Sequence, residues 1–137
     1  MAAGSRFHVP ADGGPVWAGM ADLVLVLPSG RELELPYLGE PPHGDSFHSL
    51  TIDGAPLPGY LWGSHFVSTA DSRYLAGDWM AERFERKTIV IDISARRYLV
   101  LPKRVPGLRF DGWTLLGDGQ RQIEGFEIED SQGWMAF

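Results

Sequence analysis

The segment 66–102 constrains the fold more than any other part of the chain, because it reads as two successive β-hairpins. One pair of apolar runs flanks small and polar residues at 70–72, and a second pair flanks a polar turn at 94–97. Residues of these types favour turns. Two hairpins in succession predict an antiparallel sheet. The four apolar runs occupy residues 66–68, 73–79, 88–93 and 98–101.

Short apolar runs separated by turn residues continue through the rest of the chain. Residues 23–27 are apolar throughout, and residues 32–37 alternate between charged and apolar side chains after a turn at 28–31. Gly and Pro account for 27 of the 137 residues, and they fall mainly between the runs. This pattern predicts an all-β protein, an antiparallel meander that forms a sandwich, a barrel or a strongly curved sheet. Further strands are expected at 16–20, 47–52, 60–62, 108–116 and 122–128.

A length of 137 residues suits a single domain. Gly and Pro are frequent in residues 1–15, which we expect to form an N-terminal arm, with a single β domain over 16–137. The apolar C-terminal residues 134–137 are expected to dock on this domain.

The sequence DWMAERFERK at 78–87 is the place where one short helix is plausible. Asp78 has the side chain of an N-cap, and Ala81 and Glu82 favour helix. The apolar residues do not form a long helical stripe, so a loop between two strands remains the alternative.

Charge varies along the chain more than the total suggests. The net charge is −6, but residues 63–110 carry +4, while the segments before and after them carry −5 each. An acidic chain is not expected to bind nucleic acid, which usually requires a dominant basic surface. Acidic surface does suit a basic protein partner.

The composition also limits location and chemistry. There is no cysteine, which excludes disulfides and thiolate catalysis. No run approaches the roughly 18 apolar residues of a membrane span, and the N-terminus lacks the apolar centre of a signal peptide. We therefore expect a cytoplasmic protein that does not interact with membranes.

No arrangement of residues predicts catalysis, a metal or a cofactor. The histidines at 8, 43, 48 and 65 do not form a metal-binding motif, although Asp45 lies between two of them. Ser64, His65 and Asp71 could be written as a triad, but the glycine pattern of a nucleophile elbow is missing. We expect no catalytic residues.

Two groups of residues are candidates for contact with a partner. The first combines aromatic and acidic side chains in the segment that departs from strand patterning, and loops on a rigid sheet often carry function. Its members are Asp78, Trp79, Glu82, Phe84 and Glu85. The alternative is that the two aromatic residues close one end of the core.

The second and weaker group is an acidic cluster near the C-terminus. Its carboxylates suit a basic partner or acid–base chemistry, and the alternative is a charged edge strand that discourages aggregation. Its members are Glu124, Glu127, Glu129 and Asp130.

Residues 66–101 resemble one blade of a β-propeller. The resemblance rests on the sequence ADSRYLA at 70–76 and on IVIDISARR at 89–97, an apolar strand that ends in Asp and is followed by a polar turn. A closed propeller needs at least four blades of about 40 residues, which exceeds this chain. The resemblance therefore implies meander topology and transfers no functional residues.

The chain as a whole resembles small bacterial immunity proteins of the type VI secretion or contact-dependent kind, being short, acidic, free of cysteine and rich in strands and aromatic residues. The resemblance implies a non-catalytic binding protein that neutralises a cognate protein toxin by blocking a basic active-site cleft. Two alternatives remain open: a β module that binds carbohydrate or another small ligand, and a small β-barrel enzyme.

Overall fold

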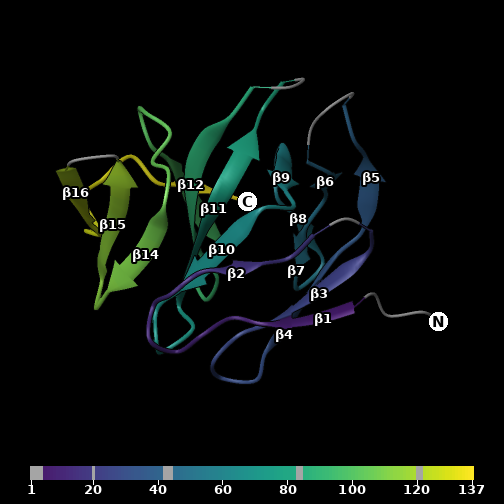
Figure 1. Ribbon diagram of the computed structural model, residues 1–137, viewed down its shortest axis with the longest axis horizontal. Coiled ribbons are helices and arrows are strands. Elements are labelled where there is room, and N and C mark those ends of the chain that lie inside the picture. The colour runs from purple at the N-terminus through teal and green to yellow at the C-terminus, as the bar shows by residue number, and fades with distance from the viewer. Residues whose placement is uncertain (1–4, 20, 42–44, 83–84, 120–121) are drawn as a thin grey trace.

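The computed structural model describes residues 5–19, 21–41, 45–82, 85–119 and 122–137. Every regular element in these residues is a β-strand, which confirms the predicted all-β fold (Figure 1). The strands, in chain order, are β1 (Ser5–His8), β2 (Val16–Trp17), β3 (Leu23–Val26), β4 (Glu32–Leu35), β5 (Tyr37–Gly39), β6 (Phe47–His48), β7 (Thr51–Ile52), β8 (Ala55–Pro56), β9 (Tyr60–Trp62), β10 (His65–Ser68), β11 (Tyr74–Met80), β12 (Lys87–Asp92), β13 (Arg97–Val100), β14 (Leu108–Asp111), β15 (Thr114–Gly119), β16 (Gln122–Glu127) and β17 (Met135–Ala136).

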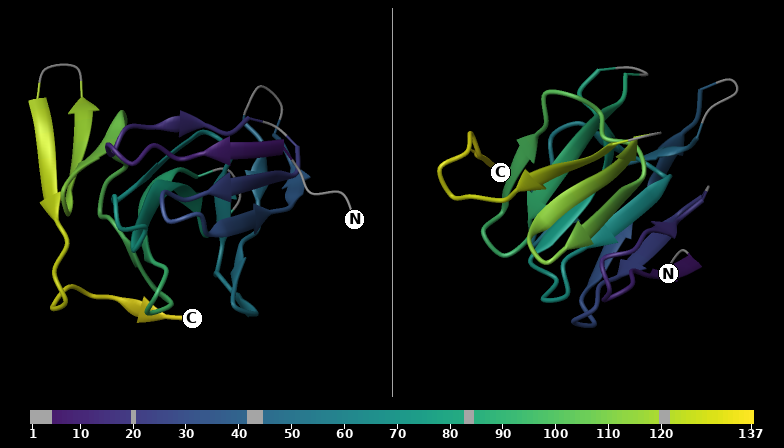
Figure 2. Two further views of the ribbon diagram at one scale, coloured as in Figure 1. Left: turned by 90° about the horizontal axis from the view of Figure 1, so that it is seen from below. Right: turned by 60° about the vertical axis from the view of Figure 1, so that its left-hand side comes forward.

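A nine-stranded sheet forms the centre of the molecule. Its main order is β17-β13-β12-β11-β9-β6-β5, and β10 joins it by pairing with both β11 and β2. Smaller sheets have the orders β1-β3-β4, β14-β15-β16 and β7-β8. The N-terminal strands, in purple and blue, and the β14-β15-β16 sheet, in green and yellow, lie on different sides of the central teal strands (Figure 2).

Strand β11 lies between two hydrophobic cores, and all seven of its residues are buried. Successive side chains of a strand point to opposite faces. Leu75 and Trp79 accordingly enter a first core with the β3 and β4 leucines, while Tyr74 and Ala76 enter a second core. The second core also contains Leu108, Phe110 and Leu115 of the β14-β15-β16 sheet.

The two hairpins expected in segment 66–102 are present. Strands β10, β11, β12 and β13 pair antiparallel in succession, so the meander predicted for this segment is confirmed. Strands β3 and β4 form the N-terminal hairpin expected at residues 23–37, with Gly30 at a φ of 92° in its turn. A positive φ of this size is readily adopted by glycine.

The structure has no helix over the described residues of 78–87, so that possibility is wrong. Asp78 pairs with Thr88 in the ladder between β11 and β12. Lys87, the first residue of β12, pairs with Trp79. Between the strands, the Glu85 carboxylate accepts hydrogen bonds from the backbone N–H groups at 81 and 82. Burial of β11 between two cores outweighs the helix propensity of the segment. No helix among the described residues is long and apolar enough to cross a membrane.

Two other expectations change. The described part of the expected N-terminal arm is not free, because β1 pairs in parallel with β3 and Val9 is buried in the first core. The strand expected over 108–116 is a hairpin, in which β14 and β15 are separated by Gly112–Trp113, and Gly112 has a φ of 59°. Glycine at the first position of a two-residue turn is a hairpin signal. The C-terminus docks as expected, with β17 on β13 and Phe137 against the first core.

Candidate functional site

An irregularity in the nine-stranded sheet lies directly beside Asp78. β9 and β10 both pair with the same edge of β11. Between these two pairings, five residues (62–66) pass beside two residues of β11, Gly77 and Asp78. The surplus residues let β9 pair with β6 and let β10 pair with β2. Bulges of this kind are common next to functional sites because they redirect side chains.

Asp78 is a buried carboxylate with an exposed fraction of 5%. A buried charge is costly unless it is paired. The Nε and Nη2 atoms of Arg104 donate to Oδ1 and Oδ2 at 3.5 and 3.2 Å. The Nε atom of Arg86 lies 3.5 Å from Oδ2, and the Ser64 hydroxyl donates to the same oxygen at 3.4 Å. Three hydrogen bonds therefore use most of the roughly four acceptor sites of the carboxylate, and the contact with Arg86 Nε is an ion pair without a hydrogen bond.

Trp62 positions Arg86. The guanidinium carbon of Arg86 lies 4.7 Å from the centroid of the Trp62 ring, a cation–π contact. The Trp62 indole N–H donates to the carbonyl of Glu85 at 3.0 Å, which fixes the chain immediately before Arg86. Arg86 also pairs with Asp45, so it connects two carboxylates.

Thr88 positions the loop that carries Arg104. Thr88 is fully buried and is the register partner of Asp78. Its hydroxyl accepts a hydrogen bond from the backbone N–H of Val105 at 2.7 Å, and its carbonyl accepts one from Leu101 at 2.9 Å. Because these bonds hold the chain on both sides of Arg104, the guanidinium is kept over the Asp78 carboxylate.

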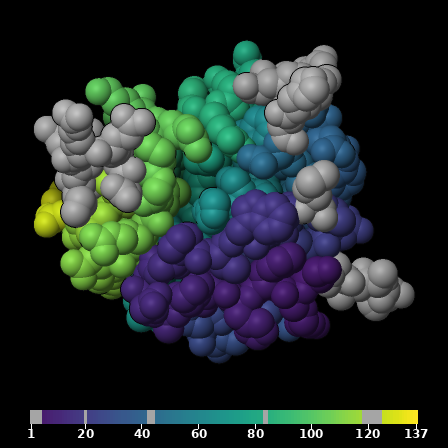
Figure 3. All heavy atoms as spheres, viewed as in Figure 1, coloured from purple at the N-terminus to yellow at the C-terminus, as the bar shows by residue number. Residues whose placement is uncertain are grey.

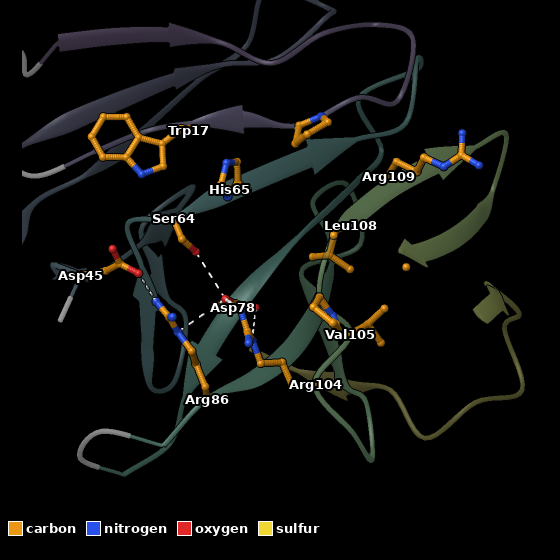
Figure 4. A pocket seen from close by; sticks show the side chains of 14 residues that line it. Trp17, Asp45, Ser64, His65, Asp78, Arg86, Arg104, Val105, Leu108 and Arg109 are labelled. Atoms are coloured by element: carbon orange, nitrogen blue, oxygen red, sulfur yellow. Dashed lines mark hydrogen bonds and ion pairs between the residues drawn. The ribbon is translucent and has the colours of Figure 1, made fainter. Parts of the chain in front are cut away.

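Asp78 and its partners form part of the wall of an open cavity of about 770 Å³ (Figure 4). Trp17 and His65 border the cavity on the side of β2 and β10, and Val105 and Leu108 border it on the side of β14. Seen from outside, the purple, teal and green parts of the chain meet around this region (Figure 3). The volume lies within the usual range for small-ligand sites, roughly 300–1,000 Å³. We call this cavity the Asp78 cleft.

The structure does not bring the first predicted group of contact residues together. Asp78 faces the cleft, whereas Trp79 points from the opposite face of β11 into the first core and donates to the Pro58 carbonyl at 2.8 Å. Glu82 is exposed and Glu85 is half-buried, both between β11 and β12. Phe84 lies outside the described residues. The alternative considered for Trp79, closure of the core, is therefore the observed one.

The weaker acidic group lies on β16 and in the residues just after it, beside the turn that contains Trp113. Thr114, next to Trp113, is the register partner of Glu127, and the Trp113 carbonyl accepts a hydrogen bond from the backbone N–H of residue 128. Trp113 has an exposed fraction of 49%. The Glu124 side chain lies outside the described part. We define the Trp113 patch by its exposed members, Asp71, Asp111, Trp113, Glu127, Glu129 and Asp130.

Two arginines hold members of the Trp113 patch in place. Arg73 lies over the Trp113 ring at 5.7 Å and pairs with the fully buried Asp92 at 3.3 Å. Arg97 joins Asp92 to Asp130, at 2.8 Å in each case. The hydrogen bond from Arg97, followed by its charge, lowers the pKa of Asp130. The carboxylate of Asp130 is therefore kept ionised on the surface.

The other chemistry considered from the sequence is not assembled. Asp71 accepts hydrogen bonds from the Thr69 hydroxyl at 2.6 Å and from the backbone N–H of Arg73 at 3.0 Å, a turn-capping arrangement. Ser64 donates to Asp78, and not to His65 or Asp71. Among the described residues, no group of three or more potential ligands is placed to hold a metal ion.

The sequence analysis did not identify the partners of Asp78, which come from three separate segments. Ser64, Arg86 and Arg104 have no spacing that would associate them, and Trp17 is distant in the chain. One signal was available: an aspartate inside the strand YLAGDWM implies a buried charge that needs a cation.

Searches of protein-family models, of curated proteins and of solved structures found no match to this chain. The class of protein that the fold and the site define is an all-β protein with an arginine-lined cleft and a separate acidic, aromatic patch. Its function has to be inferred from these two surfaces.

Proposed function

We propose that this protein is a non-catalytic binding protein, and specifically an immunity protein that neutralises a cognate toxin by covering its active site. The observation that carries the proposal is the Trp113 patch, in which a half-exposed indole and exposed carboxylates lie at the same end of the β14-β15-β16 sheet. Indole side chains are frequent anchors of protein interfaces, and a charged rim adds specificity and speeds association.

The patch is prepared for binding because its support is already in place. Tyr74 packs against Trp113 with ring centroids 5.7 Å apart and against Trp134 at 6.1 Å. Rigid aromatic groups lose little conformational entropy on binding. The carboxylates around them complement a basic surface, such as the cleft of a toxin that acts on a nucleic acid or a nucleotide.

Capture of the toxin by the patch tests this proposal. The protein and two charge-reversal variants are used to capture partners from the native host, and the captured protein is then expressed in cells with and without each form. The patch variant is Glu127→Lys with Glu129→Lys, and the matched control is Glu32→Lys with Glu34→Lys on β4, which are also exposed.

We expect the control variant to retain the partner and to protect cells against it, and the patch variant to lose both properties. Equal capture and protection by the two variants would show that the patch is not the interface. The immunity function itself would be refuted if no captured protein is toxic, or if deletion of the gene leaves cells as resistant to their siblings as before.

A further inference from the structure

The Asp78 cleft contains more hydrogen-bond donors than its own acceptors can use. An arginine side chain carries five N–H donors and no acceptor. Arg86 and Arg104 each use Nε and Nη2 in their contacts with carboxylates. The Nη1 groups of both arginines form no hydrogen bond with a described residue, and the buried Nε of Arg86 forms only the ion pair with Asp78.

Most acceptor sites of Asp78, in contrast, are already in use. Asp78 Oδ2 is approached by Arg104, Arg86 and Ser64, and Oδ1 by Arg104. A ligand that complements this arrangement must supply acceptors. Carboxylate and phosphate groups do so with the geometry that guanidinium groups recognise best.

The paired charges at this site are not explained by stability alone. Replacing a buried ion pair with apolar residues is often neutral or stabilising. The same face of β11 carries Tyr74 and Ala76, both in the second core, so an apolar residue at position 78 would continue that core. An aspartate there instead holds two arginines at the wall of a cavity.

The cleft also has room and apolar surface for the rest of a ligand. Trp17 is 54% exposed and borders the cavity, which provides a stacking surface. Val105 and Leu108 form an apolar wall across from it (Figure 4). Arg109 lies at the rim and extends away from Asp78 in this view, so it adds positive charge near the entrance and is not part of the floor.

We propose that the Asp78 cleft is a binding site for an oxyanion group, a carboxylate or a phosphate, attached to an apolar or aromatic body. The unmatched N–H groups of Arg86 and Arg104 bind the oxyanion, and Trp17 contacts the body. Asp78 acts as a positioning residue that orients both guanidinium groups. The proposal does not depend on the toxin partner, because the Trp113 patch lies at the other end of the β14–β15 hairpin.

Titration of the full chain with defined oxyanions tests the site. Inorganic phosphate, citrate and a hexaglutamate peptide are added separately at constant ionic strength, and the Trp17 indole and arginine Nε–H signals are followed by NMR. We expect a saturable shift of these signals. Arg104→Gln should raise the dissociation constant of the tightest probe at least tenfold, and Arg104→Lys should have an intermediate effect because it keeps charge without the planar fork.

Arg6→Gln is the matched control. Arg6 is an exposed arginine that pairs with Glu32, and both residues lie in the β1-β3-β4 sheet and do not line the cleft. We expect it to leave the dissociation constant within about twofold, since screened charge at a distance contributes little. Arg104 lies on an exposed loop with 43% of its side chain accessible, so the variants are expected to fold, and the NMR spectrum verifies this directly.

The probes also identify the source of the oxyanion. Hexaglutamate binding at least tenfold tighter than citrate would indicate acidic side chains of a protein chain, whereas tighter binding of phosphate or citrate would indicate a free small molecule. The proposal is overturned if none of the three probes gives a saturable shift, or if Arg104→Gln and Arg6→Gln bind equally well.

Discussion

Asp78 and Thr88 face each other across β11 and β12, and both side chains are buried on the face that carries the cleft. One holds the arginines, and the other holds the loop from which Arg104 projects. Thr88→Val keeps the shape of the side chain but removes the acceptor for the Val105 N–H. We expect the free energy of unfolding to fall by about 1–3 kcal/mol, because a part-buried donor loses its partner.

Urea unfolding of Thr88→Val measures this loss, and Thr51→Val on β7 serves as the control because Thr51 is exposed. Equal stability of the two variants would mean that the bond to Val105 contributes nothing to the fold.

Asp92 and Asp130 provide a matched pair of carboxylates on one arginine. Both accept hydrogen bonds from Arg97, but Asp92 is fully buried and the Asp130 side chain is 87% exposed. Asp92→Asn should lower the free energy of unfolding by about 3 kcal/mol, because it leaves Arg73 and Arg97 without their buried counter-charge. Asp130→Asn should change it little, since exposed ion pairs are screened.

Urea unfolding at neutral pH compares the two variants of this pair. A loss with Asp130→Asn as large as that with Asp92→Asn would contradict the assigned burial difference.

His48 should make stability depend on pH. The ring is fully buried, its Nε2 atom lies 3.0 Å from the Ala21 carbonyl, and its Nδ1 atom has no partner among the described residues. The pKa of His48 is lowered from its ordinary value, mainly because the imidazole is buried. In the unfolded chain the pKa is about 6.5, so below that pH the unfolded state binds more protons than the folded state.

The free energy of unfolding should therefore decrease as the pH falls from about 6.5 towards the lower pKa of the folded state. Unfolding titrations between pH 7.5 and 5 measure this slope, which His48→Gln should reduce and His65→Gln, at an exposed position, should leave unchanged. An identical slope in both variants would exclude His48 as the origin.

Gly117, in β15, packs closely against the loop between β13 and β14 that carries Arg104. A Cβ atom at this position would lie 2.1 Å from Cγ1 of Val105 and 3.1 Å from the carbonyl oxygen of Pro106. Gly117→Ala should displace that loop and lower the free energy of unfolding by about 1–3 kcal/mol through overpacking. It should also weaken oxyanion binding, because Arg104 precedes Val105.

Gly125→Ala on the adjacent strand is the control, since its nearest neighbours would lie at an ordinary 3.5 Å. Thermal unfolding and the citrate titration distinguish the two variants, and similar behaviour of both would show that the loop adapts without cost.

Much of the fold follows from local sequence. The alternation at residues 32–37 and the turn residues at 28–31 specify the β3–β4 hairpin without reference to the rest of the chain. The same is true of the meander from β10 to β13. The Gly112–Trp113 turn between β14 and β15 is equally local, and the same kind of turn rule predicts it.

The cleft could not be derived in this way, because it depends on pairings between distant segments. Successive side chains of β11 point to opposite faces of the strand. Whether Asp78 faces solvent or the second core therefore depends on which face it occupies and on which sheet covers that face. The bulge at 62–66 is defined by β6 and β2, the distant partners of β9 and β10. Periodicity within one segment contains no information about these partners.

The burial of β11 and β12 between two cores has a consequence for how the molecule unfolds. Both cores contain side chains of β11 and β12, so exposing either core also uncovers one face of these two strands. The sheets on either side therefore have little independent stability. We expect a single cooperative transition in which signals from Trp79, on one face, and Trp113, beyond the other, change together. A molecule bound at Asp78 would then protect the whole sheet from opening, and with it the β3–β4 hairpin, which does not line the cleft.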